Sequence, residues 1–239
     1  MRRNLYKHSE DIIKIENKKS LESKLYQLKQ LHQEKDILEQ ETIKIFVSEL
    51  VAHGKDANQI RQISQISKIL GLSLGLGAEY CNTLEQAAKI YDIGNIVICT
   101  NVYRKEDKLS FEEFKMVKEH TTFGYDILIH RDFPSTDLGA LISKEHHEWC
   151  NGGGYPSQLV KEDISIASCI VAVSDTVGAL FRKRPGRTVW QYDKILEYLE
   201  TRSGIQFDPD VVDVFLINQE AIHEILITDL ESVPSAWYA

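Results

Sequence analysis

Residues 144–156 read KEHHEWCNGGGYP, and the rest of the chain can be interpreted around this stretch. It holds two adjacent histidines of the 8 in the protein, followed by Glu148, a run of glycines, Tyr155 and Pro156. Neutral imidazole binds metals through a ring nitrogen, and glycines let the backbone approach a ligand closely. Two histidines at the predicted end of a helix therefore indicate a metal-binding or phosphate-contacting site.

Length and composition limit the class of protein. With 239 residues and a hydrophobic content of 43%, the chain can form one fair-sized domain with an appendage, or two small domains. Acidic residues exceed basic ones, 36 against 28, which gives a net charge of -8. This balance argues against general nucleic-acid binding, although it is compatible with a local basic patch.

The cysteines and the N-terminal residues predict a cytoplasmic protein. No two cysteines form a C-x-x-C pair, and all of them stand in otherwise apolar segments, as reduced thiols in the cytosol do. The N-terminus MRRNLYK lacks the apolar run of a signal peptide, and no apolar run reaches the length of a membrane span. We therefore expect no membrane association. The cysteines are Cys81, Cys99, Cys150 and Cys169.

Residues 1–54 have the composition of a long helix or a helix pair. They are rich in Lys, Glu, Gln and Leu, contain no proline, and have their first glycine at Gly54. Apolar residues recur every three or four positions from Leu21 to Leu50 and predict one apolar stripe. The stripe can pack on the chain's own domain or form a homodimerisation arm. A strict heptad is not sustained over four repeats, so both alternatives stay open.

Further helices are predicted after the break at His53 and Gly54, and they make the fold class all-α. Ser110 and Glu113 match a capping box, which starts a helix that brings His120 near its end. The predicted domain spans residues 55–226, and residues 227–239 form a C-terminal tail that is either disordered or docked through its aromatic residues. The predicted helices cover residues 60–70, 79–92, 110–120, 136–149, 165–181, 188–202 and 208–226.

Two acidic residues occupy positions where a carboxylate is unfavourable unless a cation or a metal ion lies nearby. Asp92 is expected at or just past a helix C-terminus, where the helix dipole disfavours an anion, so it requires a nearby cation. Asp175 lies in the middle of an almost wholly apolar helix, and burying it costs several kcal/mol unless it is paired or coordinated. The alternative for Asp175 is a cap or a salt bridge to Arg184 or Arg187.

These acids and three histidines form one candidate set. His120 taken alone is as compatible with a surface position as with a ligand, whereas the adjacent pair in residues 144–156 favours a site. Scattered over four predicted helices, the set is what an all-helical phosphohydrolase needs to assemble a metal centre. Its members are Asp92, His120, His146, His147 and Asp175.

At four separated places the chain resembles the HD-GYP family, the bacterial branch of the HD-domain metal phosphohydrolases that linearises cyclic di-GMP. The pattern HHExxNGxGYP at 146–156 resembles the signature of that family, and the resemblance extends over about residues 55–225. It implies an HD-domain bundle of some five to seven helices with the site in its middle. The other matching segments are YDIGNI at 91–96, KEH at 118–120 with Gly124 and Tyr125, and AVSD at 172–175 followed by Arg184, Pro185 and Arg187.

The resemblance also implies roles for individual residues. The metal ligands would be the five members of the candidate set, with Asp92 as the bridging ligand and, in an active enzyme, the catalytic carboxylate. Arg184, Arg187 and Tyr155 would contact the bound nucleotide, with surface arginines as the alternative for the first two.

The chain departs from the family pattern at several site positions. Tyr91 replaces the histidine of the His-Asp doublet, and a phenol with a pKa near 10 is a poor ligand at neutral pH unless a strongly Lewis-acidic iron deprotonates it. Asn95 replaces the lysine thought to contact the phosphate, and Asn151 replaces an acid. Gly178 stands where another acid is usual. One helix earlier, residues 58–62 read NQIRQ, without histidine or glutamate.

These departures predict one divalent metal ion, such as iron or manganese, or none, in place of two or three. Three functions are then compatible with the sequence. The first is a degenerate HD-GYP module with little or no phosphodiesterase activity, which senses cyclic di-GMP or a related nucleotide or binds a signalling protein. The second is a working single-metal phosphohydrolase in which Asp92 or Asp175 orients the attacking water. The third is an interaction protein that dimerises through its N-terminal helix.

Overall fold

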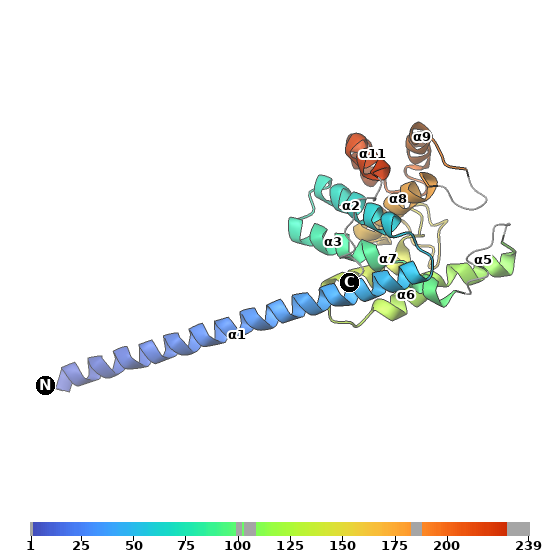
Figure 1. Ribbon diagram of the computed structural model, residues 1–239. Helices are drawn as coiled ribbons and strands as arrows, with labels where there is room; N and C mark the ends of the chain where they lie inside the picture. The colour runs from blue at the N-terminus through green and yellow to red at the C-terminus, as the bar shows by residue number, and fades with distance from the viewer. Residues whose placement is uncertain (1, 99–101, 103–108, 183–187, 229–239) are drawn as a thin grey trace. The chain divides into compact units, whose positions relative to one another are not determined.

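The computed structural model describes residues 2–98, 102, 109–182 and 188–228, with the backbone alone for residues 2–21 and 23. In this part of the chain the regular structure is helical, and the only β-pairings are two isolated bridges, Asn151 with Val160 and Ser203 with Phe207. The all-α prediction is confirmed. The elements are α1 (Arg2–Ala52), α2 (Ala57–Ser73), α3 (Ala78–Ile90), η1 (Ile93–Val97), α5 (Phe111–Lys118), α6 (His120–Leu128), α7 (Pro134–Glu145), η2 (Lys161–Asp163), α8 (Ile166–Leu180), α9 (Tyr192–Arg202), α10 (Pro209–Ile217) and α11 (Gln219–Ile227) (Figure 1).

The chain divides into two compact units, Met1–Thr42 and Ile43–Ala239. The first unit consists of the N-terminal part of α1, and its described apolar side chains are exposed. The second unit contains all the other helices. The predicted boundaries at residues 54 and 226 stay predictions, and residues 229–239 of the expected tail lie outside the described part of the chain.

The core of the second unit lies between α2, α3, α7 and α8. Helix α2 packs on α3 and on α8, while α7 packs on α3 and α6 (Figure 1). The almost wholly apolar α8 supplies fully buried side chains such as Ile170, Val173 and Val177. Because α8 is buried along most of its length, its hydrophobicity contributes to the core of this bundle.

Local signals placed the start of one helix correctly, but the ends of that helix and of the next predicted one wrongly. The capping box is present, since Ser110 Oγ accepts from the Glu113 amide at 3.2 Å and Glu113 Oε2 accepts from the Ser110 amide at 2.6 Å. The helix nevertheless ends at Lys118, and His120 begins α6. Likewise α7 begins at Pro134 and ends at Glu145, so His146 is its C-cap and His147 follows the helix.

The predicted helix 208–226 is two helices that meet at Asn218. The Asn218 side chain donates to the Val214 carbonyl at 2.7 Å and to Ser73 Oγ at 2.9 Å. Asparagine side chains compete in this way with the helical backbone bonds, which accounts for the break between α10 and α11. Among the described residues, no helix combines the length and the apolar composition that crossing a membrane requires.

Candidate metal centre

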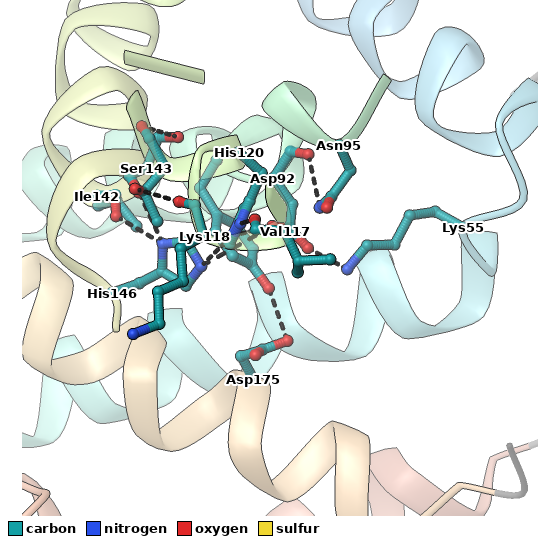
Figure 2. Close-up of polar contacts among 12 residues, drawn as sticks. Lys55, Asp92, Asn95, Val117, Lys118, His120, Ile142, Ser143, His146 and Asp175 are labelled. Carbon is teal, nitrogen blue, oxygen red and sulfur yellow. Dashed lines mark hydrogen bonds and ion pairs between the residues drawn. The ribbon is translucent and has the colours of Figure 1, made fainter. Parts of the chain in front are cut away.

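Four of the five predicted ligands lie together in the second unit. Asp92 stands in the turn between α3 and η1, just past the end of α3 as predicted. His120 begins α6, His146 caps α7, and His147 is the next residue along the chain. Figure 2 shows the side chains of Asp92, His120 and His146 converging from these three elements.

The donor atoms of four residues lie close together around one point. One nitrogen from each of the three histidines lies within 4.8 Å of the others, and the Nε2 atoms of His120 and His146 are 3.3 Å apart. Asp92 Oδ1 lies 3.5 Å from the first of these Nε2 atoms and 3.8 Å from the second. Ligands bound to one ion at about 2.0–2.2 Å lie about 3.0–3.5 Å from each other. The 3.3 Å and 3.5 Å separations fall in this range, and the longer ones would have to shorten when an ion binds. Imidazole nitrogens with a carboxylate oxygen are the donor types that suit a divalent transition metal.

Backbone carbonyl groups orient two of the imidazole rings. His120 Nδ1 lies 2.6 Å from the Val117 carbonyl, and His146 Nδ1 lies 3.0 Å from Ile142 O and 2.9 Å from Ser143 O. A carbonyl oxygen only accepts hydrogen bonds, so each Nδ1 carries the proton. The Nε2 lone pairs of both rings then face the centre, which is the arrangement that metal-binding histidines show.

Two glycines allow the segments of the centre to approach one another. A Cβ atom at Gly94 would collide with the backbone carbonyl of His120, so the turn after Asp92 can lie against α6 only because this residue is glycine. A Cβ atom at Gly154 would meet the backbone of residues 147–149 in the same way. The glycine of the Gly-Tyr-Pro turn therefore lets the turn fold back over the histidine pair.

Two buried glutamates hold the loop that follows the histidines. Glu148, 3% exposed, accepts from the Ser157 amide at 2.6 Å and from the Leu159 amide at 3.0 Å. Glu145 accepts from the Ser165 amide at 3.0 Å. The sequence showed Glu148 next to the histidines but did not reveal that its carboxylate anchors the loop 157–159.

Asp175, the fifth predicted ligand, accepts a hydrogen bond from Tyr91. The Tyr91 hydroxyl donates to Asp175 Oδ1 at 2.8 Å, and the Tyr91 ring lies edge-on to His146 with ring centroids 4.8 Å apart. Asp175 is only partly buried in α8. Its role as a metal ligand stays a prediction, and the alternative partners Arg184 and Arg187 lie outside the described residues. Tyr91, which stands in place of the family's histidine, is thus the hydrogen-bond partner of Asp175.

Lys55 was not identified as a site residue from the sequence, but it contacts the centre directly. Its Nζ forms an ion pair with Asp92 Oδ2, and both side chains are 10% exposed (Figure 2). The available signal was the unfavourable position of Asp92 at a helix C-terminus, which predicted a nearby cation without indicating which one. Lys55 lies in the connection between α1 and α2, far from Asp92 in sequence, so only the fold pairs them.

Lys55 favours an ionised Asp92 carboxylate, and burial favours neutral imidazoles at His146 and His147. Burial by itself raises the pKa of Asp92, but Lys55, His120 and His146 outweigh that effect and hold the pKa below its usual range. Burial lowers the pKa of His146 and, further, that of His147, where His146 and His120 add to the effect. A carboxylate and neutral imidazoles are the forms that bind metals.

Tyr155, a predicted nucleotide contact, lies at one edge of the centre, whereas Arg184 and Arg187 lie outside the described residues. The Tyr155 ring stacks on His147 with centroids 4.8 Å apart, and Lys118 Nζ lies 4.9 Å from the Tyr155 ring centroid. Burial, and then the charges of Asp92 and Asp175, raise the pKa of Tyr155, so its hydroxyl stays protonated at neutral pH. Lys118 was not predicted as a site residue.

The residues that depart from the family pattern have structural partners here. Asn95 Nδ2 donates to the Asp92 carbonyl at 3.1 Å, and Asn151 Oδ1 accepts from the Gly153 amide at 2.9 Å. A Cβ atom at Gly178 would lie 3.3 Å from Ile63 Cγ1, so α2 and α8 approach closely at this point. A side chain at Gly178 would require the Ile63 side chain to shift.

A helical bundle with histidine and aspartate donors at its centre is typical of the HD-domain class. Comparison with known proteins supports this assignment. The HD domain model matches residues 18–211, and the chain belongs to this family. It is 36% identical over 166 residues to the cyclic di-GMP phosphodiesterase response regulator RpfG of Xanthomonas campestris pv. campestris (strain 8004), covering 70% of this chain and 44% of that protein. It is 32% identical to a cyclic di-GMP phosphodiesterase of Thermotoga maritima, covering 69% and 45%.

Solved structures show the same fold. Bd1817, an HDGYP protein from Bdellovibrio bacteriovorus, matches with a TM-score of 0.56 and 19% identity over 68% of this chain and 51% of that one. A cyclic GMP-AMP specific phosphodiesterase of V. cholerae, V-cGAP3, matches with a TM-score of 0.56 and 18% identity over 82% and 54%. The chain spans about half the length of the relatives that it matches.

Proposed function

We propose that this chain is a degenerate HD-GYP domain that binds one divalent metal ion, iron or manganese, and senses cyclic di-GMP or a related cyclic dinucleotide with weak or no hydrolysis. The metal ligands in this proposal are Asp92, His120, His146 and His147. One observation carries it: the three histidine nitrogens lie within 4.8 Å of one another with Asp92 Oδ1 3.5 Å and 3.8 Å from two of them, while Asp175 Oδ1 is hydrogen-bonded to the Tyr91 hydroxyl. The names of the relatives support a cyclic dinucleotide as the ligand.

A divalent ion held by these residues would supply Lewis acidity to a phosphoryl oxygen and lower the pKa of a bound water molecule. The chain's own side chains would position the substrate around it. The Lys118 ammonium and the protonated Tyr155 hydroxyl, at one edge of the centre, are suited to contact phosphate oxygens. We propose Arg184 and Arg187 as further phosphate contacts from the sequence resemblance alone.

Weak hydrolysis of the nucleotide is expected because the centre lacks the phosphate-contacting lysine of the family pattern and, in this proposal, a second metal ion. Asn95, in the position of the phosphate-contacting lysine, carries no charge and donates to the backbone carbonyl of Asp92. A phosphodiester transition state spreads negative charge over its oxygens, and it needs cations or donors placed to receive that charge. Without this lysine and with one ion, binding is expected to be retained better than catalysis.

The test measures metal content, nucleotide binding and nucleotide turnover on the same purified protein. We expect about one ion per chain, detectable binding of cyclic di-GMP or 3'3'-cGAMP, and little or no product. Efficient turnover with one ion per chain would contradict the degenerate function and leave the second candidate, a single-metal phosphohydrolase in which Asp92 or Asp175 orients water. That candidate is supported by the same converging donors. A protein without metal and without nucleotide binding would leave only an interaction module.

We further propose that the N-terminal part of α1 forms a homodimer in the cytoplasm of a bacterial cell, beside a signalling partner. Leu31, Leu38 and Ile45 stand at every seventh position of α1 and are 62%, 59% and 61% exposed. Leu28 adds a further exposed side chain at coiled-coil spacing. A seven-residue apolar repeat on one helix is complementary to a second copy of itself.

A further inference from the structure

Lys55 occupies a defined position beside the candidate metal centre. Its backbone amide donates to the Leu50 carbonyl at 3.0 Å, which ties the connection between α1 and α2 to the end of α1. From there its side chain reaches Asp92, and both side chains are 10% exposed. An ammonium and a carboxylate so shielded from water interact far more strongly than a pair on the surface.

The two oxygen atoms of Asp92 have different partners. Oδ1 lies 3.5 Å from His120 Nε2 and 3.8 Å from His146 Nε2, on the side where the histidine nitrogens meet. Oδ2 contacts the Lys55 ammonium. In a two-metal centre with ions about 3.5–4 Å apart, a bridging carboxylate gives one oxygen to each ion. Here the second oxygen already has a cationic partner from the chain itself.

The surrounding groups on that side offer little to a second ion. Asp175 Oδ1 accepts from Tyr91, whose ring centroid lies 6.0 Å from Lys55 Nζ. Gln59, one turn along the chain from Lys55, is 4% exposed, and its Nε2 has no hydrogen-bond partner among the described residues. The Lys55 ammonium, the Gln59 amide nitrogen and the Tyr91 hydroxyl, which here donates to Asp175, present hydrogens on this side, and hydrogens do not attract a divalent cation. The Gln59 amide oxygen and the second Asp175 oxygen are the acceptors that remain.

We propose that Lys55 is a built-in counter-cation for Asp92 that replaces a second metal ion and restricts the centre to one. This inference rests on the proposed one-metal function. It has two consequences: the metal-free protein keeps Asp92 paired and stays folded, and the single ion is bound less tightly than it would be by an Asp92 without a cationic partner.

Manganese binding by Lys55 variants tests the proposal. Lys55→Met removes the charge, and Lys55→Glu replaces it with a carboxylate. Lys68→Met is the matched control, because Lys68 forms a 2.7 Å ion pair with Glu85 that involves no residue of the centre. The number of Mn²⁺ ions per chain and their Kd are measured by elemental analysis and calorimetry, and the melting temperature is measured in chelator and in excess Mn²⁺.

The native protein and Lys68→Met are expected to bind one ion. Lys55→Met should bind that ion at least about tenfold more tightly, because Asp92 loses its competing partner, and it should melt at lower temperature in chelator. Lys55→Glu should bind a second ion. Two ions in the native protein, or unchanged ion number and Kd in folded Lys55→Met, would overturn the proposal.

The two proposals fail in different ways. If the native protein binds one ion and Lys55→Met behaves like Lys68→Met, the Lys55 inference falls and the proposed function stands. If the native protein binds no ion or nucleotide while the Lys55 variants gain an ion, the proposed function falls together with the restriction to one ion, and only the competition of Lys55 with a metal for Asp92 stands. If Lys55→Glu does not fold, the ion number and the Kd of Lys55→Met alone test the proposal.

Discussion

Tyr91 changes the centre through a single hydroxyl group. A histidine at this position could donate a nitrogen lone pair to a metal, whereas the phenol donates a hydrogen bond to the carboxylate of Asp175 at 2.8 Å. Tyr91 is 3% exposed, so this bond is largely shielded from water. Compared with the histidine of the family pattern, this residue offers no nitrogen ligand and is instead the hydrogen-bond partner of Asp175.

Removing the Tyr91 hydroxyl should destabilise the protein more than removing an equivalent neutral bond. For Tyr91→Phe we expect a loss of about 2 kcal/mol of unfolding free energy, because a hydrogen bond to a charged acceptor is lost. Tyr192→Phe is the control, since its hydroxyl donates to the neutral Gln219 carbonyl at 2.7 Å and should cost about 1 kcal/mol. Urea denaturation measures both. If the two variants lost the same unfolding free energy, the bond from Tyr91 to Asp175 would be no stronger than a neutral hydrogen bond.

The thiol of Cys150 is expected to react slowly. Burial, and then the charge of Asp208, raise the pKa of Cys150 to about 11. The thiolate fraction at pH 8 then falls more than about a hundredfold below that of a free thiol with a pKa near 8.5. Iodoacetamide labelling, read by mass spectrometry of the Cys150 peptide, should accelerate up to about pH 10 in the native state. Labelling at pH 8 as fast as in urea would contradict this.

At the scale of elements, the centre depends on where helices end. Both His120 and His146 stand at helix boundaries, where backbone carbonyls of the preceding turn accept from their Nδ1 atoms. The loop after α7 then returns to the centre because Glu148 accepts two of its amides. Helix termini and one anchored loop, rather than helix faces, therefore bring the ligands together.

Glu148→Gln should release that loop. An amide keeps the shape of the carboxylate but loses the charge and one acceptor oxygen, so we expect a loss of about 2–3 kcal/mol of unfolding free energy. Limited proteolysis should also cut the segment 151–160 faster. Glu162→Gln, at an exposed position of η2, is the control and should stay within about 0.5 kcal/mol of the native protein. Unchanged proteolysis would show that other contacts hold the loop.

The apolar repeat of α1 predicts a dimer that charges can disrupt. Leu31→Lys with Leu38→Lys should convert the dimer to a monomer, because each copy would place lysines in the apolar seam. Gln33→Lys with Gln40→Lys adds the same charge at the same spacing outside that row and should leave the dimer intact. Light scattering after size-exclusion chromatography measures the mass. A native monomer would refute self-association.

At the scale of the whole molecule, metal binding should stabilise the fold. Manganese at about one hundred times its Kd raises the unfolding free energy by about 2.7 kcal/mol, which corresponds to about 5–10 °C in a chain of this size. The combination His120→Ala with His146→Ala should abolish this shift, whereas His53→Ala, at an exposed position after α1, should retain it. Thermal denaturation with and without chelator measures it. A shift that persists without the two histidines would place the ion elsewhere.

Much of the architecture could be predicted from local sequence. Apolar periodicity located the helices, and the capping box at Ser110 placed the start of α5. Histidines and acids at four motifs indicated the residues that converge. These signals are short-range: each depends on neighbours within one or two helical turns, which the sequence displays directly.

The pairings at the centre are long-range and depend on the fold. Lys55 with Asp92 and Tyr91 with Asp175 join segments that the sequence places far apart, and no periodicity links them. The helix break before His120 and the bonds from Glu148 to the loop 157–159 were likewise not predicted from the local sequence pattern. Residue types and helical periods therefore establish the family and the available donors. Which cation meets which carboxylate is decided by tertiary packing, because burial removes the water that would otherwise satisfy each charge.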